Sequence, residues 1–387
     1  MTGQDRAEAR GITWDDGLEC WVVSDPALAR VVLNHREFSS QTSKRLGELY
    51  MTEESRQQHR NLTEFLRLWF VHTDGEEHAA LRKPLLRMFS ASHTRSLGPQ
   101  VEAIVDACLD DLTADARYDA VPTVAQGVSG RVMGHIVGVP QDPAVLHGWS
   151  RTLSGFIAAM YRRDHAQAAD RVMLEMTEAL ELSPMVGEFP RDTPQNRART
   201  IATWAMILFG GLETTASLIG SCLLAVLEDP ALWEHVRADR PGEVESLVES
   251  VLEKRPPLRN VGRVVARDFE FEGAQLHGGD LVLVSLAGGG LFDADLSDLA
   301  PVTERADRHL VFGHGVHYCI GAPLARLEAA TVLRRFVQRF PDAALAENAV
   351  EWGPNLSYVG LDHLFLDLGG NRSPETPLPT ALETTTG

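Results

Sequence analysis

The ten residues FGHGVHYCIG, at positions 312–321, constrain this chain more than any other segment. They contain three glycines, two histidines and one cysteine, and they end just before a predicted helix that begins near Ala322. Glycines at this spacing allow a backbone to turn tightly and to lie against a flat, bulky group. The segment therefore predicts a tight loop that presents Cys319 at the N-terminus of a helix.

Three interpretations of Cys319 are open from its neighbours alone. A zinc site would use His314, His317 and Cys319, but structural zinc needs a fourth ligand and the sequence contains no second cluster. A lone cysteine is commonly a buried structural residue, which leaves the surrounding glycines unexplained. A helix N-terminus lowers the pKa of a thiol and supplies N–H groups to a thiolate, so the third interpretation is an axial ligand of haem iron.

The pattern F-G-x-G-x-H-x-C-x-G, followed by APLAR, resembles the haem-ligand loop of the cytochromes P450. The matching positions are Phe312, Gly313, Gly315, His317, Cys319 and Gly321. The resemblance implies a mainly α fold with small β-sheets, a single large domain around a buried haem b. It also implies that Cys319 is the iron ligand, that Phe312 and Gly321 belong to the haem-binding loop, and that His317 contacts a haem propionate.

A second segment, residues 201–228, is apolar on nearly all sides, as a fully buried helix would be. In its middle, the adjacent Gly210 and Gly211 and the polar run Glu213-Thr214-Thr215 interrupt it. A glycine inside a helix costs about 1 kcal/mol relative to alanine, and a buried carboxylate costs more unless it is paired. We therefore expect a helix opened locally over a ligand, in preference to a packing accident with a solvated glutamate. By resemblance, Gly210 begins the family's small-Gly-x-acid-Thr pattern, in which Thr214 assists oxygen activation and Glu213 relays protons.

A predicted helix near residue 80 carries His78 and Arg82, which lie four residues apart on one face. Alone, the two would make an ordinary solvated helix face. Beside the cysteine loop they resemble the family's H-x-x-x-R pair, which implies that they bind a haem propionate. Arg263 matches a further propionate contact, in the strand that follows the helix near residue 250. Arginine and histidine hold carboxylates by charge-assisted hydrogen bonds.

The resemblance fails at the family's E-x-x-R pair, which precedes a Pro-Pro turn and joins a third arginine in a later meander. Alignment on the turn at 256–257 puts Ser250 at the glutamate position, Glu253 at the arginine position and Leu299 at about the third position. Loss of one partner would leave an uncompensated buried charge, whereas replacement of all three need not be costly. We expect Ser250 to hydrogen-bond backbone, and Glu253 to pair with a nearby arginine or to face solvent.

The remaining patterns predict one mainly helical domain over residues 1–369, followed by a polar tail at 370–387 whose composition predicts disorder. A hairpin is predicted at 12–23 around a DG turn. Helices are predicted at about 26–34, 76–89, 95–113, most of 120–180, 193–228, 230–238, 242–254 and 322–339. Short strands are predicted at about 259–285 and 350–368.

Charge and cysteine usage exclude several functional classes. The formal net charge of −18 argues against nucleic acid as a partner. Four scattered cysteines do not make a disulfide scaffold. The first residues contain no apolar core of a signal peptide, and no stretch reaches the roughly 18 uninterrupted apolar residues of a membrane span. We therefore expect a soluble cytoplasmic protein with no membrane partner.

The resemblance implies an oxidoreductase, a monooxygenase that inserts one atom of O₂ into a small organic substrate, either free or tethered to a carrier protein. Many members of the family act in secondary-metabolite biosynthesis, and we expect the same here from the resemblance alone, since no residue of the sequence indicates it. Electrons would come from a ferredoxin-type donor with its reductase, and a basic patch of Arg82, Lys83, Arg87 and Arg326 would receive the acidic ferredoxin. We expect a monomer. Two alternatives are a haem-thiolate enzyme of coupling, rearrangement or nitrene chemistry and a non-enzymatic haem carrier or sensor; the acid–alcohol pair Glu213-Thr214 favours neither.

Overall fold

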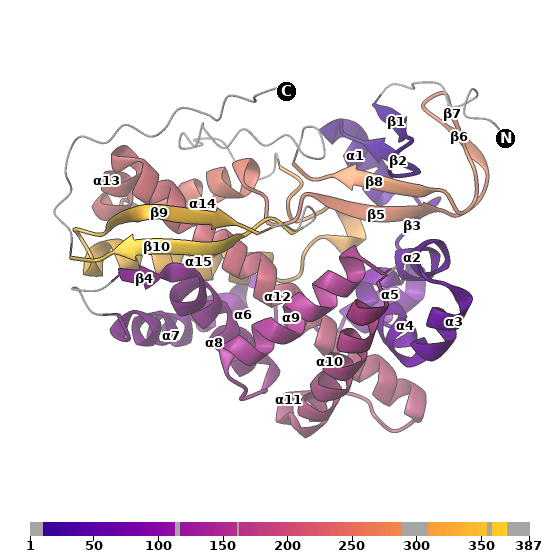
Figure 1. Cartoon of the computed structure of the whole chain (residues 1–387), viewed down its shortest axis with the longest axis horizontal. Coiled ribbons are helices and arrows are strands. Elements are labelled where there is room, and N and C mark those ends of the chain that lie inside the picture. The colour runs from indigo at the N-terminus through magenta and orange to yellow at the C-terminus, as the bar shows by residue number, and fades with distance from the viewer. Residues whose placement is uncertain (1–10, 113–116, 161, 288–308, 354–357, 370–387) are drawn as a thin grey trace.

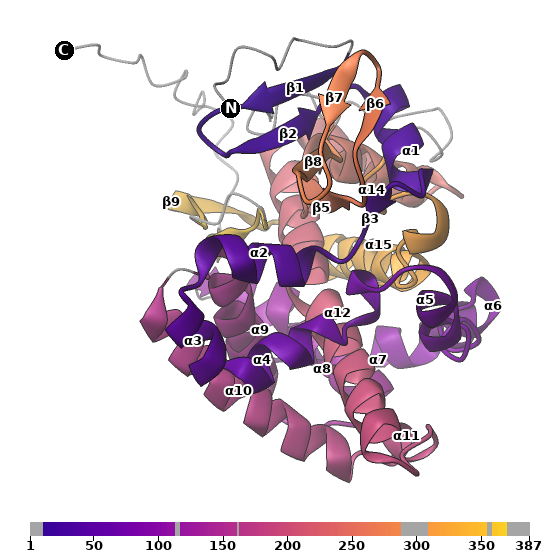
Figure 2. The same ribbon diagram turned by 90° about the vertical axis from the view of Figure 1, so that its right-hand side faces the viewer.

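The computed structural model describes residues 11–112, 117–160, 162–287, 309–353 and 358–369. The expected tail at 370–387 and Leu299 lie outside the described residues. Figures 1 and 2 show a β-sheet at one end of the molecule, a helical body beside it, and one long helix through the middle of that body. The described part of the chain is thus a mainly helical fold with small sheets, as expected.

The helical elements follow one another from near the N-terminus to residue 339. They are α1 (Pro26–Asn34), α2 (Thr42–Tyr50), α3 (Glu53–Gln58), α4 (Arg60–Arg67), η1 (Phe70–His72), α5 (Gly75–Arg82), α6 (Ala91–Ser96), α7 (Gly98–Asp110), η2 (Val121–Ala125), α8 (Gln126–Val137), α9 (Pro143–Ala158), α10 (Arg163–Leu182), α11 (Pro184–Gly187), α12 (Pro194–Glu228), α13 (Pro230–Ala238), α14 (Glu243–Lys254), η3 (Gly315–His317) and α15 (Ala322–Arg339).

The strands of the described residues form three small sheets. They are β1 (Ile12–Asp15), β2 (Cys20–Val23), β3 (Phe38–Ser39), β4 (Arg117–Asp119), β5 (Asn260–Val265), β6 (Phe269–Phe271), β7 (Ala274–Leu276), β8 (Leu281–Ser285), β9 (Ala344–Trp352) and β10 (Leu361–Asp367). One sheet has the order β1-β2-β8-β5-β3, a second β4-β10-β9 and a third β6-β7. In the first sheet β2 and β8 are parallel while the other pairs are antiparallel, so the N-terminal hairpin is joined to strands from late in the chain.

Capping residues explain why several helices begin where the sequence predicts. The side chain of Asp25 accepts a hydrogen bond from the backbone N–H of Leu28 at the start of α1, Thr193 caps α12 in the same way, and Asp229 caps α13. A proline follows each of these three caps at the first helical position, where its missing N–H has no cost. The predicted bounds of 26–34 and 230–238 are confirmed, and that of 193–228 is confirmed to within one residue.

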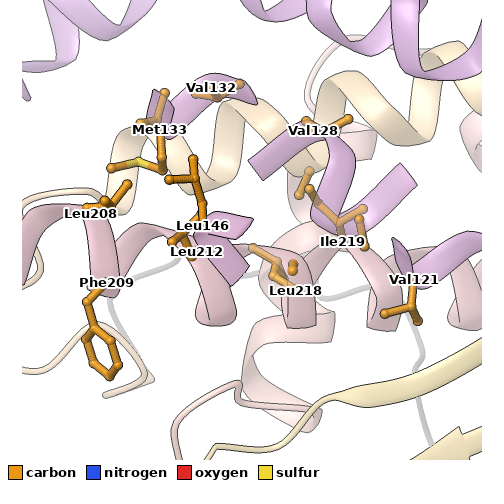
Figure 3. Close-up of a cluster of buried hydrophobic side chains, with 14 of the residues drawn as sticks. Val121, Val128, Val132, Met133, Leu146, Leu208, Phe209, Leu212, Leu218 and Ile219 are labelled. Carbon is orange, nitrogen blue, oxygen red and sulfur yellow. The ribbon is translucent and has the colours of Figure 1, made fainter. Parts of the chain in front are cut away.

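The long helix α12 has 35 residues and forms the centre of the core. Among the described residues, α12 is the one helix that is long and apolar enough to cross a membrane. However, 72% of its most apolar 18-residue window is buried inside the fold. In Figure 3, Leu212 and Ile219 of α12 lie toward side chains of α8 and α9. A Cβ atom on Gly211 would meet the sulfur of Met133 at 2.4 Å, so this glycine permits close packing of α12 on α8. α12 is therefore a core helix.

Other predicted bounds differ from the structure. The helix expected at 76–89 ends at Arg82, the one expected at 95–113 is divided into α6 and α7, and the helices within 42–67 were not predicted. The hairpin at 12–23 is confirmed, with Ile12 opposite Val23. The segment expected to open within α12 is continuous α-helix, so that expectation is wrong.

Candidate functional site

The cysteine loop is a compact turn between Phe312 and α15. Gly313 and Gly315 both have positive φ angles, of 72° and 70°, which only glycine adopts without strain. The N–H of Cys319 donates to the carbonyl oxygen of Phe312 at 2.8 Å, and the N–H of Tyr318 donates to that of Gly315 at 3.1 Å. These bonds close the loop and hold Cys319 next to the first turn of the helix.

Gly315 also lies directly against the N-terminal part of the chain. A Cβ atom at this position would stand 1.9 Å from the side-chain oxygen of Asn34, at the end of α1. The glycine of the loop is thus required both by its backbone angle and by the close approach of α1.

The backbone N–H groups of Gly321 and Ala322, at the start of α15, lie near the thiol of Cys319 and act to lower its pKa. Burial raises the pKa of this thiol, and the two N–H groups and the positive charges of Arg82 and Arg326 oppose the rise. The net lowering expected from the helix N-terminus is therefore wrong for the free thiol, because desolvation outweighs it. A cation at the sulfur would reverse that balance, since a thiol that ligates a metal is deprotonated.

A cluster of histidines and arginines lies beside the loop. The ring of His78, on α5, packs against that of His317 with centroids 4.1 Å apart. Burial, followed by the positive charges of His317 and Arg82, lowers the pKa of His78 to about 4. Arg263, on β5, is 7% exposed, and burial lowers its pKa to about 10. Arg82 donates to the carbonyl oxygen of Tyr318, so α5 is bonded to the cysteine loop itself.

Two further polar residues, Ser40 and Asp74, complete this cluster, and the sequence analysis missed both. The hydroxyl of Ser40 lies 3.0 Å from Nε2 of His317, and the carboxylate of Asp74 lies 3.9 Å from the same atom. Although burial acts against ionisation of Asp74, the nearby imidazole of His317 and hydrogen bonds from residues 39 and 40 hold its pKa well below the usual range. Both residues are far from His317 in sequence, so no local sequence pattern indicates that they contact it.

This arrangement fits a haem on two observations. The Cys319 sulfur has two N–H donors suited to a thiolate, as an axial sulfur ligand requires. His78 is 3% exposed, and its Nε2 atom has no hydrogen-bond partner among the described residues, although it lies in the same cluster as Arg82 and Arg263. A buried orphan donor beside two guanidinium groups is suited to a carboxylate of the propionate type.

The acid–alcohol pair lies on α12. The hydroxyl of Thr214 donates to the carbonyl oxygen of Gly210 at 2.7 Å, so its polarity is satisfied within the continuous helix. The Glu213 carboxylate is 22% exposed, and its Oε1 atom lies 3.4 Å from Nδ1 of His147, on α9. Burial and the negative charge of Glu213 raise the pKa of Tyr358 to about 12. The sequence analysis identified Glu213 and Thr214 but missed His147.

The proximal helix α14 carries a different ion pair from the one expected. Glu249 accepts hydrogen bonds from both Nε and Nη2 of Arg326, on α15, and its Oε2 atom lies 2.9 Å from Nε2 of His309. The guanidinium of Arg326 also stands over the ring of Phe312, 4.3 Å from its centroid. The side chain of Arg326 is 26% exposed, and its charge is paired with Glu249, so it has less positive charge to offer a partner than the sequence predicted.

The positions aligned with the missing pair have other environments. Ser250 is fully buried. Glu253 is half-buried, and no ion pair within the described part of the chain includes it. Arg255, an arginine near it in sequence, instead pairs with Glu228 at 2.8 Å. The pairing alternative for Glu253 is therefore not observed among the described residues.

The zinc interpretation gains no support from the structure. Within the described ranges, no group of three or more His, Cys, Asp or Glu side chains is placed to hold a metal ion. His317 instead bonds to Ser40 and packs on His78.

Comparisons with known proteins agree with this geometry. No family model matches the chain. The chain is 31% identical to the cytochrome P450 monooxygenase PikC of Streptomyces venezuelae, over 93% of this chain and 88% of that protein. It is similar to the tirandamycin C-bound P450 monooxygenase TamI (TM-score 0.78, 27% identity, 90% of each chain). It also shares the fold of P450BioI, solved with an acyl carrier protein that bears hexadec-9Z-enoic acid (TM-score 0.77, 22% identity, 92% of this chain and 94% of that one).

Proposed function

This chain belongs to the cytochrome P450 family, and from that premise we propose which of its residues bind the haem, move protons and meet its partners. Members of the family carry haem b, and the chain is accordingly a haem-dependent monooxygenase, an oxidoreductase that uses O₂. The balanced reaction consumes a substrate C–H bond, O₂, two electrons and two protons, and it yields a C–OH bond and one water.

The observation that carries the site assignment is the thiol of Cys319, with the N–H groups of Gly321 and Ala322 directed at it. Cys319 is the iron ligand, and its two N–H donors stabilise the thiolate. A haem held by a thiolate supplies the cleavage of O₂, because the sulfur donates electron density to the iron. Phe312 and Gly321 shape the loop against the haem face.

The buried cationic cluster binds the haem propionates. Arg263 and His317 hold one side of the cluster, and His78 and Arg82 hold the α5 side. The orphan Nε2 atom of His78 supports this role, because a propionate oxygen would give it the partner that it lacks among the described residues.

Glu213 and Thr214 handle protons on the oxygen side. The Thr214 hydroxyl donates its one hydrogen to Gly210 and keeps its lone pairs, so Thr214 would accept a hydrogen bond and orient the proton at the reacting oxygen, which the carboxyl group of Glu213 would resupply. Gly210 leaves room beside them: a Cβ there would meet only the flexible end of Met206, at 3.3 Å. The two residues thus form the inner end of a proton path.

The partners follow from charge and from the relatives. The substrate is a small organic molecule of secondary metabolism, either free or attached to a carrier protein, as in the neighbour solved with a loaded acyl carrier protein. Electrons come from a ferredoxin-type donor and its reductase. With Arg326 engaged by Glu249, the exposed cations left for an acidic donor are Lys83 and Arg87. The enzyme acts as a cytoplasmic monomer.

The test of the iron ligand is the absorption spectrum of the reduced, CO-bound protein. The wild type and the control His314→Ala should both show the red-shifted Soret band of thiolate ligation, and Cys319→Ala should lose it. A Cys319→Ala protein with an unchanged thiolate band would refute the assignment.

A second measurement separates the candidate functions. With NAD(P)H, a surrogate ferredoxin and its reductase, a monooxygenase yields a product that contains one atom from ¹⁸O₂. A product without added oxygen would favour coupling or rearrangement, and the absence of substrate-dependent NAD(P)H consumption would favour a haem carrier or sensor.

A further inference from the structure

A buried histidine on α9 connects the proton-relay acid to a second helix. His147 is fully buried, and its two ring nitrogens face different helices. Nδ1 lies 3.4 Å from Oε1 of Glu213, on α12, and Nε2 lies 3.1 Å from the hydroxyl of Ser129, on α8. His147 is thus the central member of a chain Ser129–His147–Glu213 that crosses three packed helices.

The hydroxyl of Ser129 determines where the hydrogens of His147 lie. It donates to the carbonyl oxygen of Ala125, at 2.9 Å. A hydroxyl has one hydrogen, so toward His147 it acts as an acceptor, and Nε2 of the ring must carry a hydrogen. The imidazole is thereby fixed in one tautomer, with Nδ1 directed at the carboxyl group of Glu213.

The contact between Nδ1 and Oε1 then requires a second hydrogen. A neutral ring with hydrogen on Nε2 presents a lone pair at Nδ1, and this lone pair would repel an ionised carboxylate. His147 is fully buried and the Glu213 side chain is 22% exposed, so an unpaired lone pair or charge at this contact is costly. The contact is attractive only when one proton lies between them, either as imidazolium with carboxylate or as imidazole with carboxylic acid.

We propose that His147 and Glu213 hold one transferable proton between them, and that His147, fixed by Ser129, positions the carboxyl group that resupplies Thr214. In either arrangement the pair has no net charge, which suits a buried site. The proposal rests on the proposed role of Glu213 and extends the proton path beyond α12. His147 acts through Glu213 and is a positioning residue.

The other groups near this chain do not compete for the proton. Tyr358 interacts electrostatically with Glu213, and its raised pKa keeps it neutral and protonated. Trp149, on the same helix as His147, donates to Glu175 of α10, which directs that carboxylate away from His147. Among the described residues, the polar groups bonded to His147 are therefore Ser129 from α8 and Glu213 from α12.

The first test does not depend on turnover. Histidine-selective ¹⁵N NMR of the full-length, haem-loaded ferrous–CO protein, which is diamagnetic, reports whether each ring nitrogen carries hydrogen. The His147 signals are those that disappear in His147→Asn. We expect Nε2 to carry hydrogen and Nδ1 to be protonated or to accept a hydrogen bond. A ring with a lone pair at Nε2, or with an unbonded lone pair at Nδ1, would overturn the proposal.

The second test compares two substitutions. In His147→Asn the side-chain amide can still donate to Glu213 but cannot share a proton, whereas His147→Phe removes both functions. Both should slow product formation by about tenfold, below the roughly 10²–10⁴-fold of a group in direct proton transfer. The solvent deuterium isotope effect on turnover should rise in both, which a merely structural role would not cause. His165→Asn, which loses only a bond to the carbonyl oxygen of Gly155, is the matched control.

The outcomes separate this proposal from the function on which it rests. If Glu213→Gln slows turnover while both His147 variants keep the wild-type rate and isotope effect, the histidine has no part and the inference fails alone. If Glu213→Gln also has no effect, the proposed role of Glu213 fails first. Full recovery of rate and isotope effect in His147→Asn would mean that the residue only orients the acid, which contradicts a shared proton.

Discussion

Replacement of Gly315 by alanine measures how strongly the cysteine loop depends on one glycine. Two costs can be worked out separately. A non-glycine residue at a φ of 70° pays roughly 1–2 kcal/mol for left-handed backbone. The new Cβ would lie 1.9 Å from Oδ1 of Asn34, so that side chain must rotate away and lose its 3.2 Å hydrogen bond to the carbonyl oxygen of Arg30, at about 0.5–1 kcal/mol. The expected destabilisation is therefore roughly 1.5–3 kcal/mol.

A double-mutant cycle separates these two costs. In an Asn34→Ala background the new Cβ has no Asn34 side chain to displace, so Gly315→Ala should lower the free energy of unfolding only by the cost of the left-handed backbone. The coupling free energy between the two substitutions should therefore be about 0.5–1 kcal/mol. The assay is unfolding of the haem-loaded protein by denaturant, together with the rate of haem loss to an acceptor. Gly148→Ala is the matched control, because its Cβ has no atom within 4 Å and alanine should stabilise that helix by up to about 1 kcal/mol. Equal costs of Gly315→Ala in both backgrounds would refute the reasoning about Asn34, and no cost in either would refute the loop geometry.

Three other substitutions test different parts of the structure. Glu249→Gln should destabilise the protein by about 3–5 kcal/mol in denaturant unfolding, because Arg326 keeps a mostly buried charge without its partner; a loss below 1 kcal/mol would contradict that view. Glu328 is 1% exposed, neither of its carboxyl oxygens has a hydrogen-bond partner among the described residues, and burial raises its pKa well above 4.5. The fold is therefore most stable with respect to this group below pH 4.5, where Glu328 is neutral in both the folded and the unfolded chain, and it loses stability as pH rises toward the folded-state pKa. Glu328→Gln should raise the melting temperature more at pH 8 than at pH 5, and an equal rise at both would count against a buried neutral acid. Thr214→Ala should still bind haem and substrate but divert electrons from NAD(P)H to peroxide, which a peroxide assay alongside product yield would measure; unchanged coupling would remove Thr214 from the proton path.

The parts of the fold that sequence predicted are those with local causes. Asp25, Thr193 and Asp229 each precede a proline, so the starts of α1, α12 and α13 are marked by the chain itself. The cysteine loop is likewise marked by its glycines. The helices at 42–67 were missed because they are short, and α3 buries no residue that would create a periodic apolar pattern.

What sequence could not predict depends on contacts between distant residues. Arg326 lies 77 positions after Glu249, and Glu213 lies 66 after His147, so neither pair leaves a local pattern. The opened helix was a different error. It rested on the cost of glycine inside a helix and of a buried carboxylate, whereas Gly211 permits close packing against Met133 and Glu213 has His147 beside it.

The long-range contacts of the cysteine loop set the order of events during biosynthesis. His317 meets Ser40, 277 positions earlier, and the carbonyl oxygen of Tyr318 meets Arg82, 236 positions earlier. On the ribosome, the residues that surround the prosthetic group are thus completed only when most of the chain has emerged. On the proposed assignment of Cys319, a nascent chain that stops before this residue lacks the iron ligand, whatever else has folded. Insertion of haem is consequently a late and largely post-translational step for this protein, and truncated products should not sequester the cofactor.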